Sequence, residues 1–202
     1  AASKRDRPKH PNPFAEARYQ LVEALYLIRK QSRGKYGLFQ PDFICIIFSP
    51  MMVSKHQRSN ADIKKAVTAW CRNSAEAIFN YGHISKWNTS LVTNMKELFQ
   101  YKRDFNDDIS KWDVSSVTNM SHMFSNTPFN GDISGWNVSN VTDMRSMFSN
   151  APFNGDISEW DVSSVTAMGA MFNESAFNGD ISGWDVSNVT DMHDMFENEV
   201  SF

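Results

Sequence analysis

Aspartate side chains recur at a fixed interval in the second half of this chain, a pattern that can bind metal. Equivalent positions, 24 residues apart, are occupied by Asp108, Asp132, Asp156 and Asp180. Like charges stacked about 5 Å apart repel by ~1 kcal/mol in water and by several times more near a protein surface. Backbone donors, solvent or a cation must offset this repulsion, and Ca²⁺ is a cation that clustered carboxylates bind.

These four aspartates are therefore candidates for a calcium site, or for a calcium-dependent or glycan-binding surface. Neither EF-hand spacing nor a Gly-Gly-x-Gly-x-Asp repeat accompanies them. Aspartates also cap turns, because their carboxylates accept hydrogen bonds from nearby backbone N–H groups. The sequence favours this turn-capping role and predicts no metal site.

Catalytic chemistry has little support in the sequence. The serines and threonines belong to a repeated pattern, and phosphate-binding, dinucleotide-binding and zinc-protease motifs do not occur. The five histidines lie at unrelated points, at His10, His56, His83, His122 and His193. We therefore predict that the protein is not an enzyme and needs no cofactor.

The elements that must position these side chains follow from a repeat. The string Ile-Ser-x-Trp occurs five times, and its tryptophans are 25 residues apart once and then 24 residues apart three times. A period of this length is typical of stacked repeats, in which each unit contacts only its neighbours. Stacked repeats present extended surfaces to partners, so binding is the function that the pattern favours.

Each unit contains two apolar segments. In the third unit Val141, Met144, Met147 and Phe148 have the spacing of one helix face, which predicts a short helix. Ile133, in Gly-Asp-Ile-Ser-Gly, predicts a short parallel strand. Stacking would then place Trp, Phe and Met in buried columns. A further column of amides is expected to satisfy neighbouring backbone groups; its members are Asn106, Asn130, Asn154 and Asn178.

The chain before the repeat is different. Residues 1–13 form a basic tail, and residues 14–58 form an extension with a predicted helix over 15–30 and a strand over 43–48. A Ser59-x-x-Asp62 capping signature predicts a helix over 59–80. This helix would cover the aromatic core at the first end of the stack, and residues 81–202 would form five units.

The repeated string Phe-Asn-Gly-Asp-Ile-Ser-x-Trp-Asp-Val-Ser-x-Val-Thr-x-Met-x-x-Met-Phe resembles the BspA-like leucine-rich-repeat surface protein family. The resemblance covers about residues 63–202. It implies an α/β repeat fold, a leucine-rich-repeat-like solenoid of strand–turn–short-helix units. It also implies a role in interaction or adhesion, without catalytic residues. One departure is an extra residue within 100–104, and another is Phe202, which looks like the first aromatic residue of a sixth unit.

The charge is divided unevenly along the chain. Residues 1–65 hold 13 Lys and Arg against 5 Asp and Glu, whereas residues 66–202 hold 7 against 18. The acidic repeat argues against wrapping nucleic acid. No run of 18 apolar residues is present, so no membrane span is expected. Cys45 and Cys71 do not indicate a disulfide framework or a zinc site.

We therefore expect an interaction scaffold, a peripheral or linker subunit that docks through its basic extension onto an acidic surface of a larger complex. A cell-surface adhesion module is the alternative. Because the chain starts at Ala1 without a signal sequence, it is expected to be a mature chain, either organellar or secreted. The predicted partner-binding residues are Lys4, Arg5, Arg7, Lys9, Arg29, Lys30, Arg33, Lys35 and Phe202. Specificity is expected at the positions that vary between units. Those before the tryptophans are Lys111, Gly135, Glu159 and Gly183, and those on the predicted helix face are Asn119, Asp143, Ala167 and Asp191.

Overall fold

A computed structural model describes residues 56–197, which all belong to one compact unit. The predicted helix over 15–30, the predicted strand over 43–48 and the predicted partner-binding residues, Phe202 included, lie outside the described residues. None of the helices in the described part of the chain is long and apolar enough to cross a membrane.

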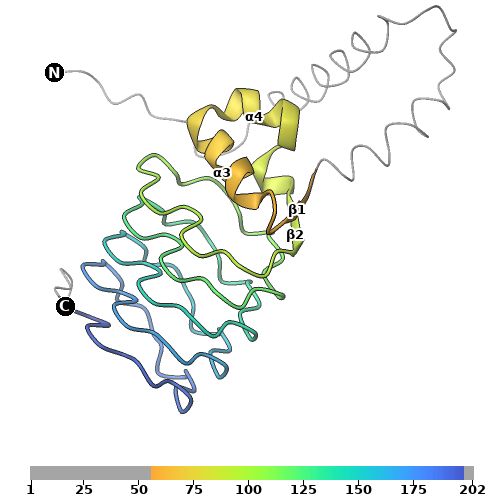
Figure 1. The fold of residues 1–202 in the computed structure, drawn as a ribbon. Coiled ribbons are helices and arrows are strands. Elements are labelled where there is room, and N and C mark those ends of the chain that lie inside the picture. The colour runs from red at the N-terminus through yellow and green to blue at the C-terminus, as the bar shows by residue number, and fades with distance from the viewer. Residues whose placement is uncertain (1–55, 198–202) are drawn as a thin grey trace, which may run out of the picture. The chain divides into compact units, whose positions relative to one another are not determined.

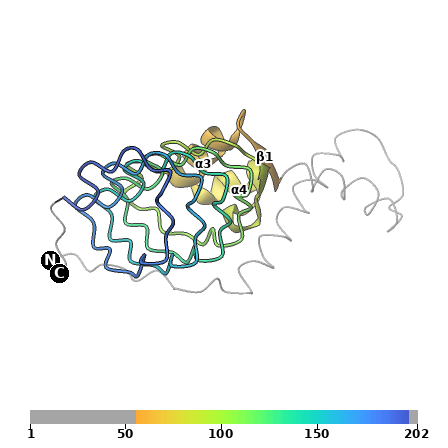
Figure 2. The same ribbon diagram turned by 90° about the horizontal axis from the view of Figure 1, so that it is seen from below.

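The described chain begins with its regular elements and continues as a stack of coils (Figure 1). The order is β1 (Gln57–Ser59), α3 (Ile63–Arg72), α4 (Ser74–Tyr81), a 3₁₀ turn (Ile84–Lys86) and β2 (Asn88–Leu91). β1 and β2 pair in parallel, with Gln57 opposite Asn88 and Ser59 opposite Leu91. Figures 1 and 2 agree that α3 and α4 lie at the end of the stack formed by the first unit.

Two helices occupy the region where the sequence predicts one. Asn73 interrupts the run with an extended backbone (φ −157°, ψ 91°), and its side chain caps α4 by accepting a bond from the Glu76 N–H. The capping signature does form an interaction, because the Ser59 N–H donates to Asp62 Oδ1 at 2.9 Å. However, Ser59 ends β1, and helix α3 begins only at Ile63.

The repeated units have a different local structure from the predicted strand and helix. Isolated parallel bridges join equivalent residues of successive units, and no α-helix is assigned between 92 and 197. The bridges pair Asn94 with Asn119, Asn119 with Asp143, Asp143 with Ala167, and Ala167 with Asp191. The parallel contact therefore lies at the start of the segment predicted to be helical, whereas the segment around Ile133 carries no bridge.

Positive φ angles explain why that segment is not a helix. In each of the first four units two residues, four positions apart, have a left-handed backbone, for example His122 at φ 57° and Asn126 at φ 58°, and in the fifth unit Asp194 does so at φ 53°. A right-handed helix cannot continue through such a residue. Backbone N–H groups bond instead to the next unit: Met120 to the Asp143 carbonyl, and His122 to the Arg145 carbonyl, at 2.8–2.9 Å. We call residues 94–101 and their equivalents in later units the ladder segments.

The core is built from columns of identical side chains. The Phe column next to the ladder stacks with ring separations of 5.5–5.8 Å; its members are Phe99, Phe124, Phe148, Phe172 and Phe196. A second column, further from the ladder, has separations of 5.9–6.3 Å; its members are Phe105, Phe129, Phe153 and Phe177. Hydrogen-bonded parallel chains lie about 4.8 Å apart. The distance between rings of successive units is therefore larger in the second column than in the first. The stack of units curves accordingly, with the ladder segments on its concave side.

The first helices cover one end of this core. Trp70 of α3 meets the Trp87 ring edge-on at 6.2 Å and donates its indole N–H to Asp107 at 2.8 Å. The buried Arg58 guanidinium lies 5.3 Å from the rings of Tyr81 and Trp87 and pairs with Asp62. Aromatic rings that an open end would expose to water are therefore covered.

Candidate functional site

The recurring aspartates cap turns. Each carboxylate accepts bonds from the backbone N–H and the hydroxyl of the serine two residues later; in the third unit Asp132 accepts from Ser134 at 3.0 and 2.8 Å. The same pairs form at Asp108, Asp156 and Asp180. The backbone donor and then the hydroxyl lower the pKa of Asp132, which offsets repulsion from its neighbours. No group of three metal-ligating side chains occurs among residues 56–197.

The asparagine column satisfies backbone groups, as predicted. Asn130 accepts a bond from the Asn154 N–H at 2.9 Å, and Asn154 accepts one from the Asn178 N–H at 3.0 Å. Asn106 receives the Asn130 N–H in the same way. These amides are fully explained by the architecture and are not candidates for ligand recognition.

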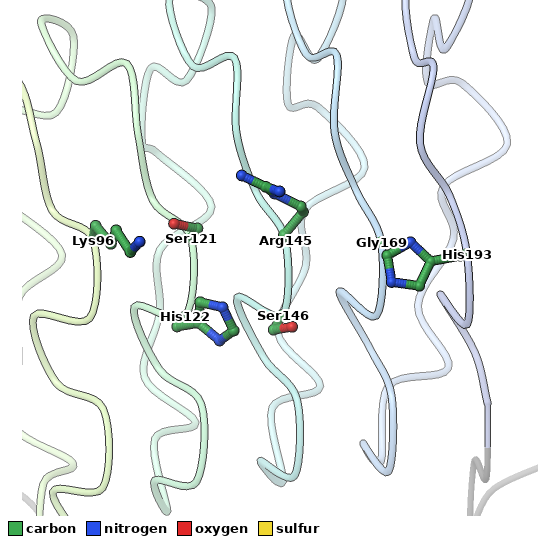
Figure 3. A pocket seen from close by; sticks show the side chains of 7 residues that line it. All are labelled: Lys96, Ser121, His122, Arg145, Ser146, Gly169 and His193. Carbon is green, nitrogen blue, oxygen red and sulfur yellow. The ribbon is translucent and has the colours of Figure 1, made fainter.

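A hollow of about 310 Å³ lies on the outer surface of the ladder segments (Figure 3). Its lining residues come from five successive units and are Lys96, Ser121, His122, Arg145, Ser146, Gly169 and His193. We call the surface formed by these seven residues the ladder face. Because the segments are held in register by backbone bonds between units, the side chains of the ladder face have fixed positions along the stack.

One column of the ladder face alternates between long basic and short residues. Counting along the stack, its members are Lys96, Ser121, Arg145, Gly169 and His193, each two residues after a bridge residue. The bridge residue and this column flank a buried methionine, such as Met144 between Asp143 and Arg145. The buried methionine anchors the chain, so its two neighbours point away from the core.

Asp143 fixes the orientation of Arg145. The Arg145 Nε–H donates to Asp143 Oδ1 at 3.0 Å, and Nη2 donates to Oδ2 at 2.7 Å. This two-bond geometry is the strong form of an arginine–carboxylate pair. The Asp143 pKa is below its usual value because bonds and charge from Arg145 outweigh the effect of partial burial.

Asp191 fixes His193 at the other end of the hollow. The His193 Nδ1 lies 2.5 Å from Asp191 Oδ1. This hydrogen bond and then the charge of Asp191 raise the pKa of His193, while nearby Arg145 opposes the rise. A protonated imidazole donates from both nitrogens, so Nε2 is presented as a donor outside the pair.

Gly169 makes room for that histidine. A methyl group in place of the Gly169 hydrogen would lie near the His193 ring, with Nδ1 at 2.6 Å, and 3.0 Å from Asp191 Oδ1. Figure 3 shows the ring over the Gly169 coil, on the side of Arg145. The glycine therefore allows a side chain of one unit to reach back across the preceding unit.

Lys96 lies at the first end of the hollow. The Lys96 Nζ lies 3.8 Å from Glu97 Oε1. The Nζ of Lys64, in α3, lies 3.5 Å from the other carboxylate oxygen, Glu97 Oε2. The carboxylate is thus shared between the first unit and the first helix. Lys96 is held more loosely than Arg145, and its ammonium group stays exposed.

The sequence located part of this site. Four of the positions expected to carry specificity, Asn119, Asp143, Ala167 and Asp191, are bridge residues, each two positions before a residue that lines the hollow. The other four, which precede the tryptophans, do not line it; they are Lys111, Gly135, Glu159 and Gly183. Lys96, Arg145 and His193 were not singled out. A signal for them does exist, since every second unit places a basic residue two positions after the bridge residue.

Comparison with known proteins places much of the described chain in a family. Residues 67–172 and 129–202 match the family described as "Mycoplasma protein of unknown function, DUF285". No curated protein and no solved structure matches the chain.

Proposed function

The chain belongs to the DUF285 family, and we propose that it is a non-enzymatic protein-interaction module that binds a partner through its ladder face. The observation that carries this proposal is the contrast between the core columns and the ladder face. Phe, Met and Trp repeat from unit to unit, whereas the lining of the hollow changes in size and charge at every step. Surface variation on a constant frame is how stacked repeats recognise partners.

The fold that we propose is a leucine-rich-repeat-like solenoid of the BspA-like type. Support comes from the 24-residue period, the parallel bridges between equivalent residues and the buried columns. The repeating indole bond fits as well, because from Trp112 onward each tryptophan Nε1 donates to the carbonyl of an isoleucine one unit earlier, as Trp136 does to Ile109 at 3.3 Å.

Within a larger assembly the module would act as a peripheral or linker subunit. The basic residues of 1–65 would dock on an acidic surface of the complex, and the ladder face would make a second contact. The uneven charge supports this division, since residues 1–65 carry a net charge of +8 and residues 66–202 carry −11. The alternative is a cell-surface adhesion module, which the resemblance to BspA-like proteins favours.

Cross-linking mass spectrometry of the full chain in its native extract tests the proposal. Reproducible cross-links from Lys96 to one partner, together with cross-links from the lysines of 1–65 to the same complex, are the expected result. A ladder-face variant, Arg145→Ala with His193→Ala, should lose the partner. A matched variant, Lys111→Ala with Glu159→Ala in the column before the tryptophans, should keep it. Retention of every partner by the ladder-face variant would overturn the proposal.

A further inference from the structure

The last described coil exposes side chains that the earlier units bury. Val186, Met192 and Phe196 are 39%, 40% and 41% exposed. Their equivalents one unit earlier are at most 1% exposed; they are Val162, Met168 and Phe172. Figures 1 and 2 place this coil at the opposite end of the stack from α3 and α4. We call the outer surface of residues 186–196 the open end.

Backbone donors at the open end have no partners. From the methionine of each ladder segment onward, the bonds between segments run one way, because N–H groups donate to the next unit and carbonyls accept from the preceding one. The N–H groups of the fourth unit donate in this way at 2.8, 2.7 and 3.0 Å; they belong to Met168, Ala170 and Phe172. The equivalent N–H groups of Met192, Asp194 and Phe196 have no acceptor within residues 56–197. A row of unpaired backbone groups is a template for another chain.

One backbone acceptor completes the pattern of the open end. The Thr166 carbonyl accepts both the N–H and the hydroxyl of Thr190, at 2.9 and 3.1 Å. The Thr190 carbonyl is the equivalent group at the open end, and no donor of the described chain reaches it. A segment that fits this row must therefore offer a donor first and then three carbonyls, in the parallel direction. Each unit of the stack offers these groups, in this order, to the unit before it.

A second copy of the chain does not offer these groups. Two open ends that face each other would place N–H groups opposite N–H groups. The first end of the stack is closed, because Asn60 takes the place of a preceding unit: its Oδ1 accepts the N–H groups of Thr93 and Asn94 at 3.0 and 3.2 Å. Trp70 of α3 covers the aromatic core at the same end. The occupant of the open end is therefore a different polypeptide.

We infer that the open end binds a protein partner that supplies one further coil of the same repeat type. The partner segment runs parallel to residues 190–196, donates an N–H to the Thr190 carbonyl and accepts the N–H groups of Met192, Asp194 and Phe196. Its apolar side chains cover Val186, Met192 and Phe196, so the buried columns continue into the partner. Main-chain bonds give affinity and the alternate side chains give specificity, as when a strand is added to a sheet edge. This site goes beyond the proposed function, because the open end is a different surface from the ladder face.

The test uses the full chain, isotope-labelled, and a synthetic peptide with the sequence of residues 161–177. This peptide contains the ladder segment of the fourth unit. A control peptide has the same composition in scrambled order. Hydrogen exchange measured by NMR should show that the amides of Met192, Asp194 and Phe196 exchange fast in the free chain and are protected by the repeat peptide. Fluorescence anisotropy should show that the repeat peptide binds at least about tenfold tighter than the scrambled one.

Variants of the chain locate the binding site. Met192→Lys should weaken binding of the repeat peptide at least about tenfold, because a charge replaces a side chain that the partner covers. Leu91→Lys makes the same change at a leucine of β2 that is 61% exposed, and it should leave binding unchanged. Arg145→Gln, on the ladder face, should also leave it unchanged. Circular dichroism confirms that the variants are folded.

Four outcomes overturn the inference. Slow exchange of the three amides in the free chain would show that the open end is already covered. Equal affinity for the two peptides would show that the apolar surface binds without regard to sequence, and no measurable binding would show that no such coil is accepted. Protection of the three amides by sulfate, without protection by the repeat peptide, would assign the row of N–H groups to an anion. If the native partner is still lost from the ladder-face variant in any of these cases, the proposed function stands and only this inference falls.

Discussion

The indole Nε1 of Trp112 donates a hydrogen bond of 3.0 Å to the carbonyl of Ile84, one unit earlier in the stack. The same carbonyl also accepts the Trp87 N–H, so it is shared between two units. Equivalent bonds recur at every later tryptophan of the described repeat. The bond couples a buried side chain to the turn of its neighbour and fixes the register between units.

Replacing Trp112 by phenylalanine should lower the free energy of unfolding by about 1–3 kcal/mol, because both a bond and buried ring volume are lost. Benzothienylalanine, which keeps the ring size but has no N–H, separates the two effects. It should cost only about 0.5–1.5 kcal/mol, the value of one hydrogen bond. Urea unfolding measures both. If benzothienylalanine destabilised the protein as much as phenylalanine does, the loss of ring volume would contribute nothing to the effect.

Among the charged residues of β1, α3 and α4, Arg58 should be the one whose substitution destabilises the protein most. It is buried beside two aromatic rings and its pKa is lowered by burial, although Asp62 and then Tyr81 oppose that effect. Arg58→Ala should destabilise the protein by about 2 kcal/mol or more, because a desolvated cation–π contact is lost. Lys65→Ala, at an exposed position of the same region, should stay within about 0.5 kcal/mol. Thermal unfolding distinguishes the two variants.

A second column of side chains also caps turns, and its members are Asp113, Asn137, Asp161 and Asp185. It predicts a difference between two substitutions at Asp161. Asp161 accepts bonds from the Ser163 N–H and hydroxyl, and its neighbour in the column is Asn137, which does the same for Ser139. Asp161→Asn should therefore keep the melting temperature, since the amide oxygen replaces the carboxylate, whereas Asp161→Ala should lower it. Millimolar calcium should leave the melting temperature of the native chain unchanged. A calcium-dependent increase that Asp161→Asn abolishes would instead show that the column binds metal.

The repeat period predicted the core well because the same side chains are buried in every unit. Ile133, Trp136, Val141 and Phe148 are all buried, as the spacing required. The local structure was predicted wrongly for a physical reason. Left-handed residues at Ser146 and Asn150 interrupt a segment whose apolar spacing is that of a helix face, and no glycine marks either position.

The ladder face was hidden in the sequence for a different reason. Lys96, Arg145 and His193 are three residue types, and they are 49 and 48 residues apart. They form one row only because the stack places alternate units at regular intervals. The role of Gly169 depends on the His193 side chain of the next unit, which no local pattern records.

Gly169→Ala should disturb the site more than the fold. The added methyl group would collide with the His193 ring, and a side chain can move away at little cost. The free energy of unfolding should change by no more than about 0.5 kcal/mol. The His193 pKa, however, should fall toward its ordinary value as the ring leaves Asp191. Titration by NMR measures this shift, and Gly135→Ala, where the methyl group meets open space, is the control. An unchanged His193 pKa in Gly169→Ala would show that the ring does not need the glycine.

The His193–Asp191 pair should stabilise the fold only within a window of pH. Hydrogen bonding and then the charge of Asp191 raise the pKa of His193, so its contribution is complete below its unfolded pKa, near 6.5, and is lost as pH rises through the higher folded value. Hydrogen bonding by His193 lowers the pKa of Asp191. That contribution is complete above the unfolded pKa, near 3.8, and is lost as pH falls through the lower folded value.

Native protein and His193→Gln should therefore differ most in stability between these limits, near pH 5, and converge at alkaline pH. Urea unfolding at several pH values measures the difference, which should be small because both side chains face solvent and salt screens them. A difference in stability that grows toward alkaline pH would contradict the pairing of His193 with Asp191.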